Sequence, residues 1–94
     1  MDIFKVVLTK QAKKDLIKLP LHVVRKLLVW VDDIENAGLI EVKKIPGYHD
    51  EPLKGERAGQ RSIRLSKAYR AIYLLDKEGR LEIIKVLEVN KHDY

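Results

Sequence analysis

Residues 61–89, RSIRLSKAYRAIYLLDKEGRLEIIKVLEV, contain three consecutive segments rich in β-branched, aromatic and other apolar side chains. Segments of this composition are typical of β-strands, and they cover residues 61–66, 69–75 and 81–89. The connections between them are short, and the second connection, residues 76–80, holds a glycine. Because strands that follow each other through short turns run antiparallel, this stretch predicts an antiparallel sheet.

Two helices are expected before these strands. Residues 10–19 are amphipathic and follow Thr9, a residue type that caps helix N-termini, and Pro20 ends the segment because proline lacks an amide hydrogen. Residues 21–37 carry apolar side chains at the three-to-four spacing of one buried helix face, and Gly38 is placed to stop this helix. The apolar positions are Val24, Leu27, Leu28, Val31 and Ile34.

The predicted fold is a single α+β domain over residues 1–94, with elements in the order β-α-α-β-β-β. Residues 3–8 form its first strand, and the two N-terminal helices cover one face of a mostly antiparallel four-stranded sheet. Residues 41–45 are a weaker candidate for an additional short strand. Residues 46–60 contain two prolines and three glycines and therefore predict a loop.

The composition excludes several classes of protein. The chain has 94 residues, of which 46% are hydrophobic and 35% charged, a balance typical of a folded globular domain. It contains no cysteine, which excludes a disulfide framework, thiolate metal sites and cysteine nucleophiles. No apolar run approaches the ~18 residues of a membrane span, and the N-terminus has no signal-peptide layout. We therefore expect a soluble, cytoplasmic protein.

The net charge of +5 is concentrated in residues 43–70. This window holds three acidic residues and eight basic ones, whereas acids and bases balance in the rest of the chain. The bases are Lys43, Lys44, Lys54, Arg57, Arg61, Arg64, Lys67 and Arg70. Clustered Lys and Arg indicate a surface that binds polyanions, and a solvated basic loop is the alternative.

The predicted hairpin places two arginines in an informative position. If its turn is centred on Lys67, Arg64 and Arg70 lie directly opposite each other, where like charges destabilise a strand pair. An anion between them would remove this penalty, and guanidinium groups bind phosphate through two hydrogen bonds. We therefore expect a phosphate site, although a shift of the turn by one residue would send the two arginines to different faces.

The loop and the C-terminal segment supply candidates for proton transfer. Lys54 can bind a phosphate, or act as a base if neighbouring cations lower its pKa. His49 in the loop and His92 in the segment NKHDY carry the group that exchanges protons near neutral pH. A weaker alternative is a metal site with the ligands His49, Asp50, Glu51 and His92. Adjacent ligands in a loop are poor support for such a site, so we expect no metal and no cofactor.

Aromatic residues add surfaces for stacking. Tyr48, Tyr69, Tyr73 and Tyr94 offer rings on which RNA bases can stack. For Tyr69 and Tyr73 a half-buried position in a strand is the alternative. Trp30 is expected in the core or at an interface.

Three segments of the chain, TKQAKKDLIKLP, PLKGERAGQRSIRLSKAYRAIY and EVNKHDY, resemble the RelE/ParE toxin superfamily, in particular its HigB-like branch. The motifs LKG-x-R-x-G and SIR-x₄-YR and a C-terminal histidine occur at family-like spacing over nearly the whole chain. The resemblance implies a bacterial or archaeal type II toxin that cuts mRNA in the A site of the 70S ribosome. It also implies a cognate antitoxin, which neutralises the toxin and through which the toxin–antitoxin complex can bind DNA.

The resemblance further implies roles for individual residues. Lys54 matches the lysine of the family's LKG segment, Arg70 the arginine of its YR-x-x-Y strand, and Arg64 a basic residue of the preceding strand. His92 matches a terminal histidine or arginine near the leaving group, and Tyr94 an orienting tyrosine. The remaining bases of the window are expected to contact RNA phosphates: Arg57, Arg61, Lys67, Lys43 and Lys44.

The implied reaction is metal-independent, because RNA carries its own nucleophile, the 2′-hydroxyl. HigB-like proteins often have a histidine directly before PLKG, where this chain has Glu51, so the general base is His49, Lys54 or Glu51. The arginines would stabilise the phosphorane, and His92 would protonate the leaving 5′-oxygen to give a 2′,3′-cyclic phosphate.

Two other functions stay open from the sequence. A ParE-like toxin shares the fold but inhibits DNA gyrase, and such relatives generally lack residues equivalent to Lys54 and His92. A non-catalytic module that binds RNA or the ribosome would use the same basic face and would be insensitive to His92→Ala. The antitoxin would cover the basic face, displace the C-terminal peptide or clamp the helices. Trp30 and the acidic end of the second helix are candidate contacts for it.

Overall fold

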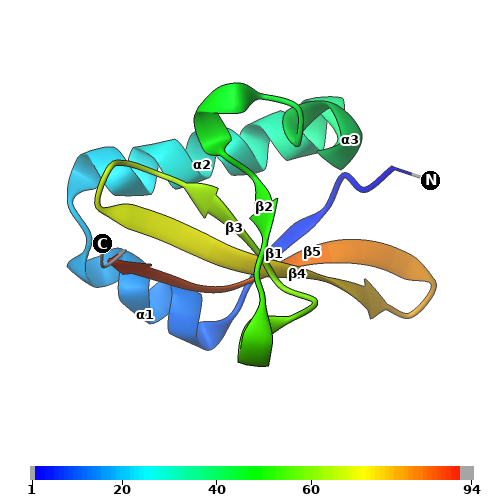
Figure 1. Ribbon diagram of the computed structural model, residues 1–94. Coiled ribbons are helices and arrows are strands. Elements are labelled where there is room, and N and C mark those ends of the chain that lie inside the picture. The colour runs from blue at the N-terminus through cyan, green and yellow to red at the C-terminus, as the bar shows by residue number, and fades with distance from the viewer. Residues whose placement is uncertain (1, 92–94) are drawn as a thin grey trace.

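The computed structural model describes residues 2–91 of the chain, and Figure 1 shows their arrangement. The helices are α1 (Lys10–Lys18), α2 (Leu21–Ala37) and α3 (Leu39–Val42), with two 3-10 turns, η1 (Pro46–Tyr48) and η2 (Gly55–Arg57). The strands are β1 (Val6–Leu8), β2 (Glu51–Pro52), β3 (Arg61–Arg64), β4 (Tyr69–Glu78) and β5 (Leu81–Lys91). None of the helices in this part of the chain is long and apolar enough to cross a membrane.

The strands form one sheet in the order β1-β5-β4-β3-β2 (Figure 1). β1 runs parallel to β5, and the other three pairs are antiparallel. The α+β class and the predicted layer of two helices on a mostly antiparallel sheet are confirmed. The sheet has five strands rather than four, because residues 51–52 of the predicted loop pair with β3.

α1 is attached to β5 by the side chains of its N-cap, Thr9, and of Asp15 in its middle. Thr9 caps the helix as predicted, since its Oγ1 accepts a hydrogen bond from Ala12 N at 3.1 Å. The same hydroxyl donates to the carbonyl oxygen of Leu87 at 2.7 Å, and Asp15 Oδ2 accepts from Val89 N at 2.9 Å. Because β1 has only three residues, these side chains satisfy backbone groups of β5 that the short parallel pair leaves open.

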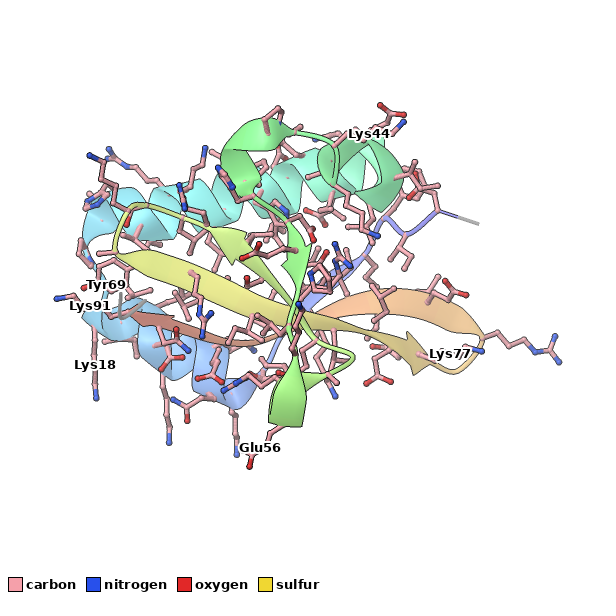
Figure 2. All side chains as sticks on the ribbon, in the orientation of Figure 1. Lys18, Lys44, Glu56, Tyr69, Lys77 and Lys91 are labelled. Carbon is pink, nitrogen blue, oxygen red and sulfur yellow. The ribbon has the colours of Figure 1, made fainter. Side chains whose placement is uncertain are left out.

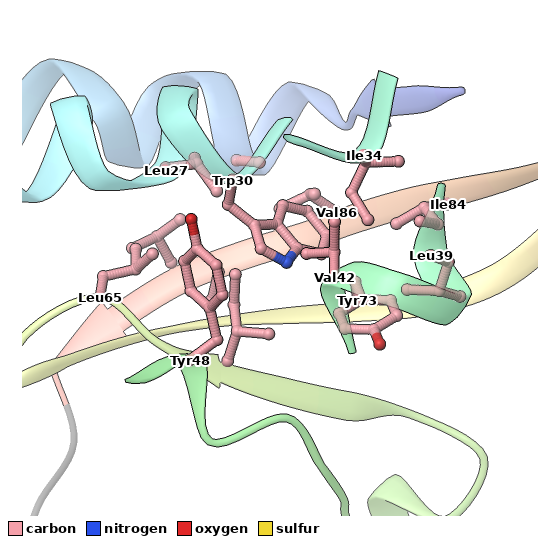
Figure 3. Close-up of a cluster of buried hydrophobic side chains, with 14 of the residues drawn as sticks. Leu27, Trp30, Ile34, Leu39, Val42, Tyr48, Leu65, Tyr73, Ile84 and Val86 are labelled. Atoms are coloured by element: carbon pink, nitrogen blue, oxygen red, sulfur yellow. The ribbon is translucent and has the colours of Figure 1, made fainter. Parts of the chain in front are cut away.

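The hydrophobic core lies between the helices and the inner face of the sheet (Figure 3). The buried residues of α2 are Val23, Leu27, Trp30 and Ile34. Trp30 packs against Tyr73 of β4 with ring centroids 5.3 Å apart and is 1% exposed. Of the two positions expected for it, the core and an interface, the structure shows the core. Trp30 therefore offers no surface for the antitoxin contact considered above.

The predicted buried face of α2 is partly wrong. Leu28 is 52% exposed, and Val24 and Val31 are only half-buried. The buried stripe instead consists of Val23, Leu27, Trp30 and Ile34, which follow one another at intervals of three or four residues. Because the indole is the largest side chain in this core, its contact with the sheet sets the rotation of the helix.

Residues 41–45 do not form the additional strand, so this expectation is wrong. Gly38 ends α2 as predicted, with φ 87° and ψ 159°, a backbone region that is essentially restricted to glycine. α3 begins directly after it, and Leu39 and Val42 are both buried. Their three-residue spacing places them on one side of a helical turn, whereas a strand would need alternation.

Replacement of Gly38 by alanine is expected to destabilise the protein. An added Cβ would lie 2.1 Å from Asp2 Oδ2, and the other oxygen of this carboxylate accepts from Ile40 N at 3.0 Å. The clash and the positive φ together predict a loss of about 1–3 kcal/mol in the free energy of unfolding, measured by urea denaturation. Gly47→Ala is the control, since no atom lies within 4 Å of its added Cβ. A Gly38→Ala variant as stable as wild type would contradict this geometry.

Candidate functional site: an arginine-lined pocket

A pocket of about 120 Å³ opens beside the hairpin of β3 and β4. Its lining comes from the segment around β2, from β3 and from the turn and first residues of β4: His49, Glu51, Ser62, Ile63, Arg64, Ser66, Tyr69 and Arg70. We call it the arginine pocket. It brings together three of the predicted catalytic residues, His49, Arg64 and Arg70, with Glu51, the alternative base.

The two arginines face each other as predicted, because Arg64 pairs with Arg70 in the register of β3 and β4. The turn between them is held by Ser66, whose Oγ accepts from Tyr69 N at 3.2 Å. Leu65 N donates to Tyr69 O at 2.9 Å, which makes the adjacent arginine pair a non-hydrogen-bonded one. In such a pair the Cα atoms are only about 4.5 Å apart, so both cationic side chains leave the same face of the sheet close together.

A chain of polar contacts runs from Arg70 across the outer face of the sheet to η2. Arg70 Nε donates to Asn90 Oδ1 at 3.3 Å, and Asn90 Nδ2 donates to Glu88 Oε2 at 3.2 Å. Glu88 in turn forms an ion pair with Arg57. Arg57, a predicted RNA contact, thus faces a carboxylate, whereas Arg64 has no carboxylate partner within residues 2–91.

Asp50 is buried between two residues that lie opposite each other in β3 and β4. Its side chain is 1% exposed and accepts hydrogen bonds from Arg61 Nε at 2.6 Å and from the Tyr73 hydroxyl at 2.5 Å. Burial raises the pKa of Tyr73 far above its usual value, and the neighbouring carboxylate raises it further, so the phenol stays protonated and donates. We call Asp50, Arg61 and Tyr73 the carboxylate anchor.

Arg61 was predicted as an RNA contact, and the structure gives it a counterion inside the protein. Burial acts to lower the pKa of Arg61, but the hydrogen bond and the charge of Asp50 outweigh burial and raise it. Its side chain is only 24% exposed. The charge of Arg61 is therefore compensated locally.

Four predicted lysines lie outside the lining of the arginine pocket. Lys54 precedes η2, and its side chain is exposed. Lys67, in the hairpin turn, and Lys43, after α3, are also exposed. Lys44 is exposed and forms an ion pair with Glu41 at 3.4 Å. These positions suit contacts with a large polyanion more than they suit chemistry inside the pocket.

The C-terminal candidates His92 and Tyr94 lie outside the described residues. β5 ends at Lys91, which pairs with Tyr69 of the pocket lining, and Figure 2 labels both residues at the same end of the sheet.

Within residues 2–91 no group of three or more His, Asp or Glu side chains is arranged to hold a metal ion.

The tyrosines differ in their exposure. Tyr48 and Tyr73 are buried, so the expectation that their rings stack on bases is wrong, and the alternative of a strand position in the interior holds for Tyr73. The Tyr48 hydroxyl donates to Asp33 Oδ2 at 2.9 Å, and Lys26 Nζ lies 4.7 Å from the ring centroid. Tyr69 is half-buried and lines the pocket, so among the described tyrosines it is the one placed to stack.

Ser66 and Asn90 belong to the pocket region but are not among the predicted site residues. Ser66 had a local signal, because a serine hydroxyl in a short turn commonly accepts hydrogen bonds from the backbone amides that follow it. Asn90 had none. It meets Arg70 only because the paired strands bring residues 20 positions apart together.

The comparisons with known proteins give matches among solved structures, whereas no model of a protein family and no curated protein matches this chain. A YoeB/ParE toxin from Agrobacterium tumefaciens is 23% identical with a TM-score of 0.67, over 95% of this chain and 99% of that chain. In the RelBE2 toxin–antitoxin complex of Mycobacterium tuberculosis the matched chain is 28% identical, with a TM-score of 0.58, over 96% of this chain and 99% of that chain. YafQ from Escherichia coli is 20% identical, with a TM-score of 0.70, over 94% of this chain and 92% of that chain.

These structures share one architecture with the chain over nearly its full length. The protein has the fold of the RelE/ParE toxin superfamily, which confirms the resemblance at the level of the superfamily. The HigB-like branch stays a prediction.

The opposed arginines predict that a small anion stabilises the folded protein. Inorganic sulfate is expected to raise the melting temperature of the wild type, because an anion that binds only the folded state shifts the unfolding equilibrium. Arg64→Gln should abolish most of this increase. At low salt the same variant should be more stable than wild type by about 0.2–1 kcal/mol, since it removes a like-charge pair.

The matched control is Lys77→Gln, which removes an exposed cation at the opposite end of β4 (Figure 2). It should keep the full response to sulfate in differential scanning fluorimetry. An equal loss of response in both variants would mean that sulfate acts on net charge and not at the arginine pocket.

Proposed function

We propose that this protein is the toxin of a type II toxin–antitoxin system and acts as a HigB-like, ribosome-dependent mRNA endoribonuclease. The observation that carries the proposal is the arginine pocket. Two guanidinium groups without carboxylate partners within residues 2–91 face each other beside His49 and Glu51, two groups able to accept a proton. Phosphoryl chemistry requires this combination of charge stabilisation and proton transfer.

The proposed reaction is an attack of the ribose 2′-hydroxyl on the adjacent phosphorus. His49 or Glu51 takes the proton of this hydroxyl, and the new bond to phosphorus forms as the bond to the 5′-oxygen breaks. Arg64 and Arg70 stabilise the additional negative charge of the phosphorane. His92 gives a proton to the leaving oxygen, so the products are a 2′,3′-cyclic phosphate and a 5′-hydroxyl.

The other candidates have supporting roles in this proposal. Lys54, Lys43, Lys44 and Lys67 contact phosphates of mRNA or of the ribosomal A site, and their exposure supports this role. Tyr94 orients the leaving group. The partner that neutralises the toxin is a cognate antitoxin, a proposal supported by the fold match to the RelBE2 toxin–antitoxin complex.

Expression of the protein in growing bacteria, followed by primer extension on an abundant message, tests the activity. Wild type should produce cuts within translated codons, and Arg70→Ala should reduce them by about 10²–10³-fold because a transition-state contact is lost. Lys77→Ala, which removes a distant exposed cation, should cut like wild type. Growth arrest with intact message would contradict the nuclease and direct attention to DNA gyrase.

The roles of His92 and of metals need separate measurements. His92→Ala should abolish the cuts while leaving the circular dichroism spectrum unchanged, since the proposed role of this residue is proton donation. In a cell-free assay of ribosomal complexes assembled with mRNA, a chelator selective for transition metals such as Zn²⁺, which spares the Mg²⁺ that ribosomes need, should leave the rate unchanged. Strong inhibition by the chelator would support the metal alternative.

A further inference from the structure

The segment that carries the two candidate bases is fastened on both sides. Before His49, the buried Tyr48 donates its hydroxyl hydrogen bond to Asp33 of α2. After it, the buried carboxylate of Asp50 accepts hydrogen bonds from Arg61 and Tyr73, the other two members of the carboxylate anchor. His49 itself has φ 45°, a left-handed conformation that side-chain-bearing residues rarely adopt. An unfavourable backbone conformation of this kind persists only where the surroundings hold it.

The anchor also determines which way the next residue points. Glu51 follows Asp50 and begins β2, where it pairs with Ser62 of β3. Because successive side chains of an extended segment point to opposite sides, an Asp50 directed into the protein directs Glu51 to the outer face. Ser62 and Glu51 accordingly both line the arginine pocket.

We propose that the carboxylate anchor is a positioning device, which holds His49 and Glu51 where either can take the 2′-hydroxyl proton of an RNA whose phosphate binds between the opposed arginines. This inference rests on the proposed function. Asp50, Arg61 and Tyr73 do not line the pocket, so the anchor acts through the segment it holds. A displacement of about 1 Å in a catalytic group can cost about 10²-fold in rate.

Arg61 and Tyr73 are suited to this role by their place in the fold. They pair with each other in the register of β3 and β4, the same register that pairs Arg64 with Arg70. The same two strands therefore position both the anchor and the opposed arginines, Arg64 and Arg70. Loss of the anchor should free the segment that carries the bases while leaving the arginines in place.

Two variants test the inference on the full chain. Tyr73→Phe removes one hydrogen bond to Asp50 and keeps the ring that packs against Trp30 (Figure 3). The double variant Asp50→Asn with Arg61→Gln removes both charges together and so leaves no unpaired buried charge. Ile84→Val, which removes a methyl group from the same core, is the matched control for a loss of stability alone.

The measurements are kcat and KM for cleavage of ribosome-bound mRNA, the stabilisation by sulfate, and amide hydrogen exchange of residues 49–51. Both anchor variants should lower kcat by at least about tenfold with KM changed less than about twofold. Their response to sulfate should equal that of wild type, and exchange of residues 49–51 should accelerate by more than about tenfold. Ile84→Val should change none of these.

Two outcomes would overturn the inference: an unchanged kcat in Tyr73→Phe, or an equal loss of kcat in Ile84→Val. If wild type itself does not cleave mRNA, the proposed function fails. Hydrogen exchange then tests on its own whether the anchor holds residues 49–51 in place. Accelerated exchange confined to residues 49–51 would then support the anchor, and unchanged exchange would contradict it.

Discussion

The register of β3 against β4 is the constraint on which both polar clusters depend. It places Arg61 opposite Tyr73, where they hold the carboxylate of Asp50, and Arg64 opposite Arg70 on the outer face. Because side chains alternate along a strand, a slip of one residue would exchange the two faces and destroy both clusters. The turn held by Ser66, together with the backbone hydrogen bond from Leu65 N to Tyr69 O, maintains the register.

The positive charge of residues 43–70 divides into two groups with different physical roles. Arg57 and Arg61 face the carboxylates of Glu88 and Asp50, and these ion pairs fasten the segment between η1 and β3 to the sheet. Arg64 and Arg70 have no carboxylate partner within residues 2–91, so their field is available to an anion. The proposed anion site is thus much smaller than the basic window of the sequence.

Features that oppose stability gather around the arginine pocket. Two like charges lie across a strand pair, and His49 adopts a left-handed backbone conformation. Throughout residues 2–91 the buried side-chain polar atoms all have hydrogen-bond partners. Such local conflict beside a satisfied core is typical of functional sites, because the surrounding packing supplies the stability that the site gives up.

Local sequence determined the limits of α1 and α2, the three late strands and the pairing of Arg64 with Arg70. Each of these depends on caps, stops and turns that act on neighbouring residues, such as Thr9 and Gly38. Only the tertiary structure decided the rotation of α2, the helical form of α3 and the short strand β2, because these depend on how side chains fill one common core.

The division of the arginines was likewise decided only in three dimensions. Arg57 meets Glu88 across 31 positions of the chain, and Arg61 meets Asp50 across 11. The pattern of charges in the sequence shows how many bases a segment holds. Which of them a carboxylate neutralises depends on the folding of distant segments onto one another.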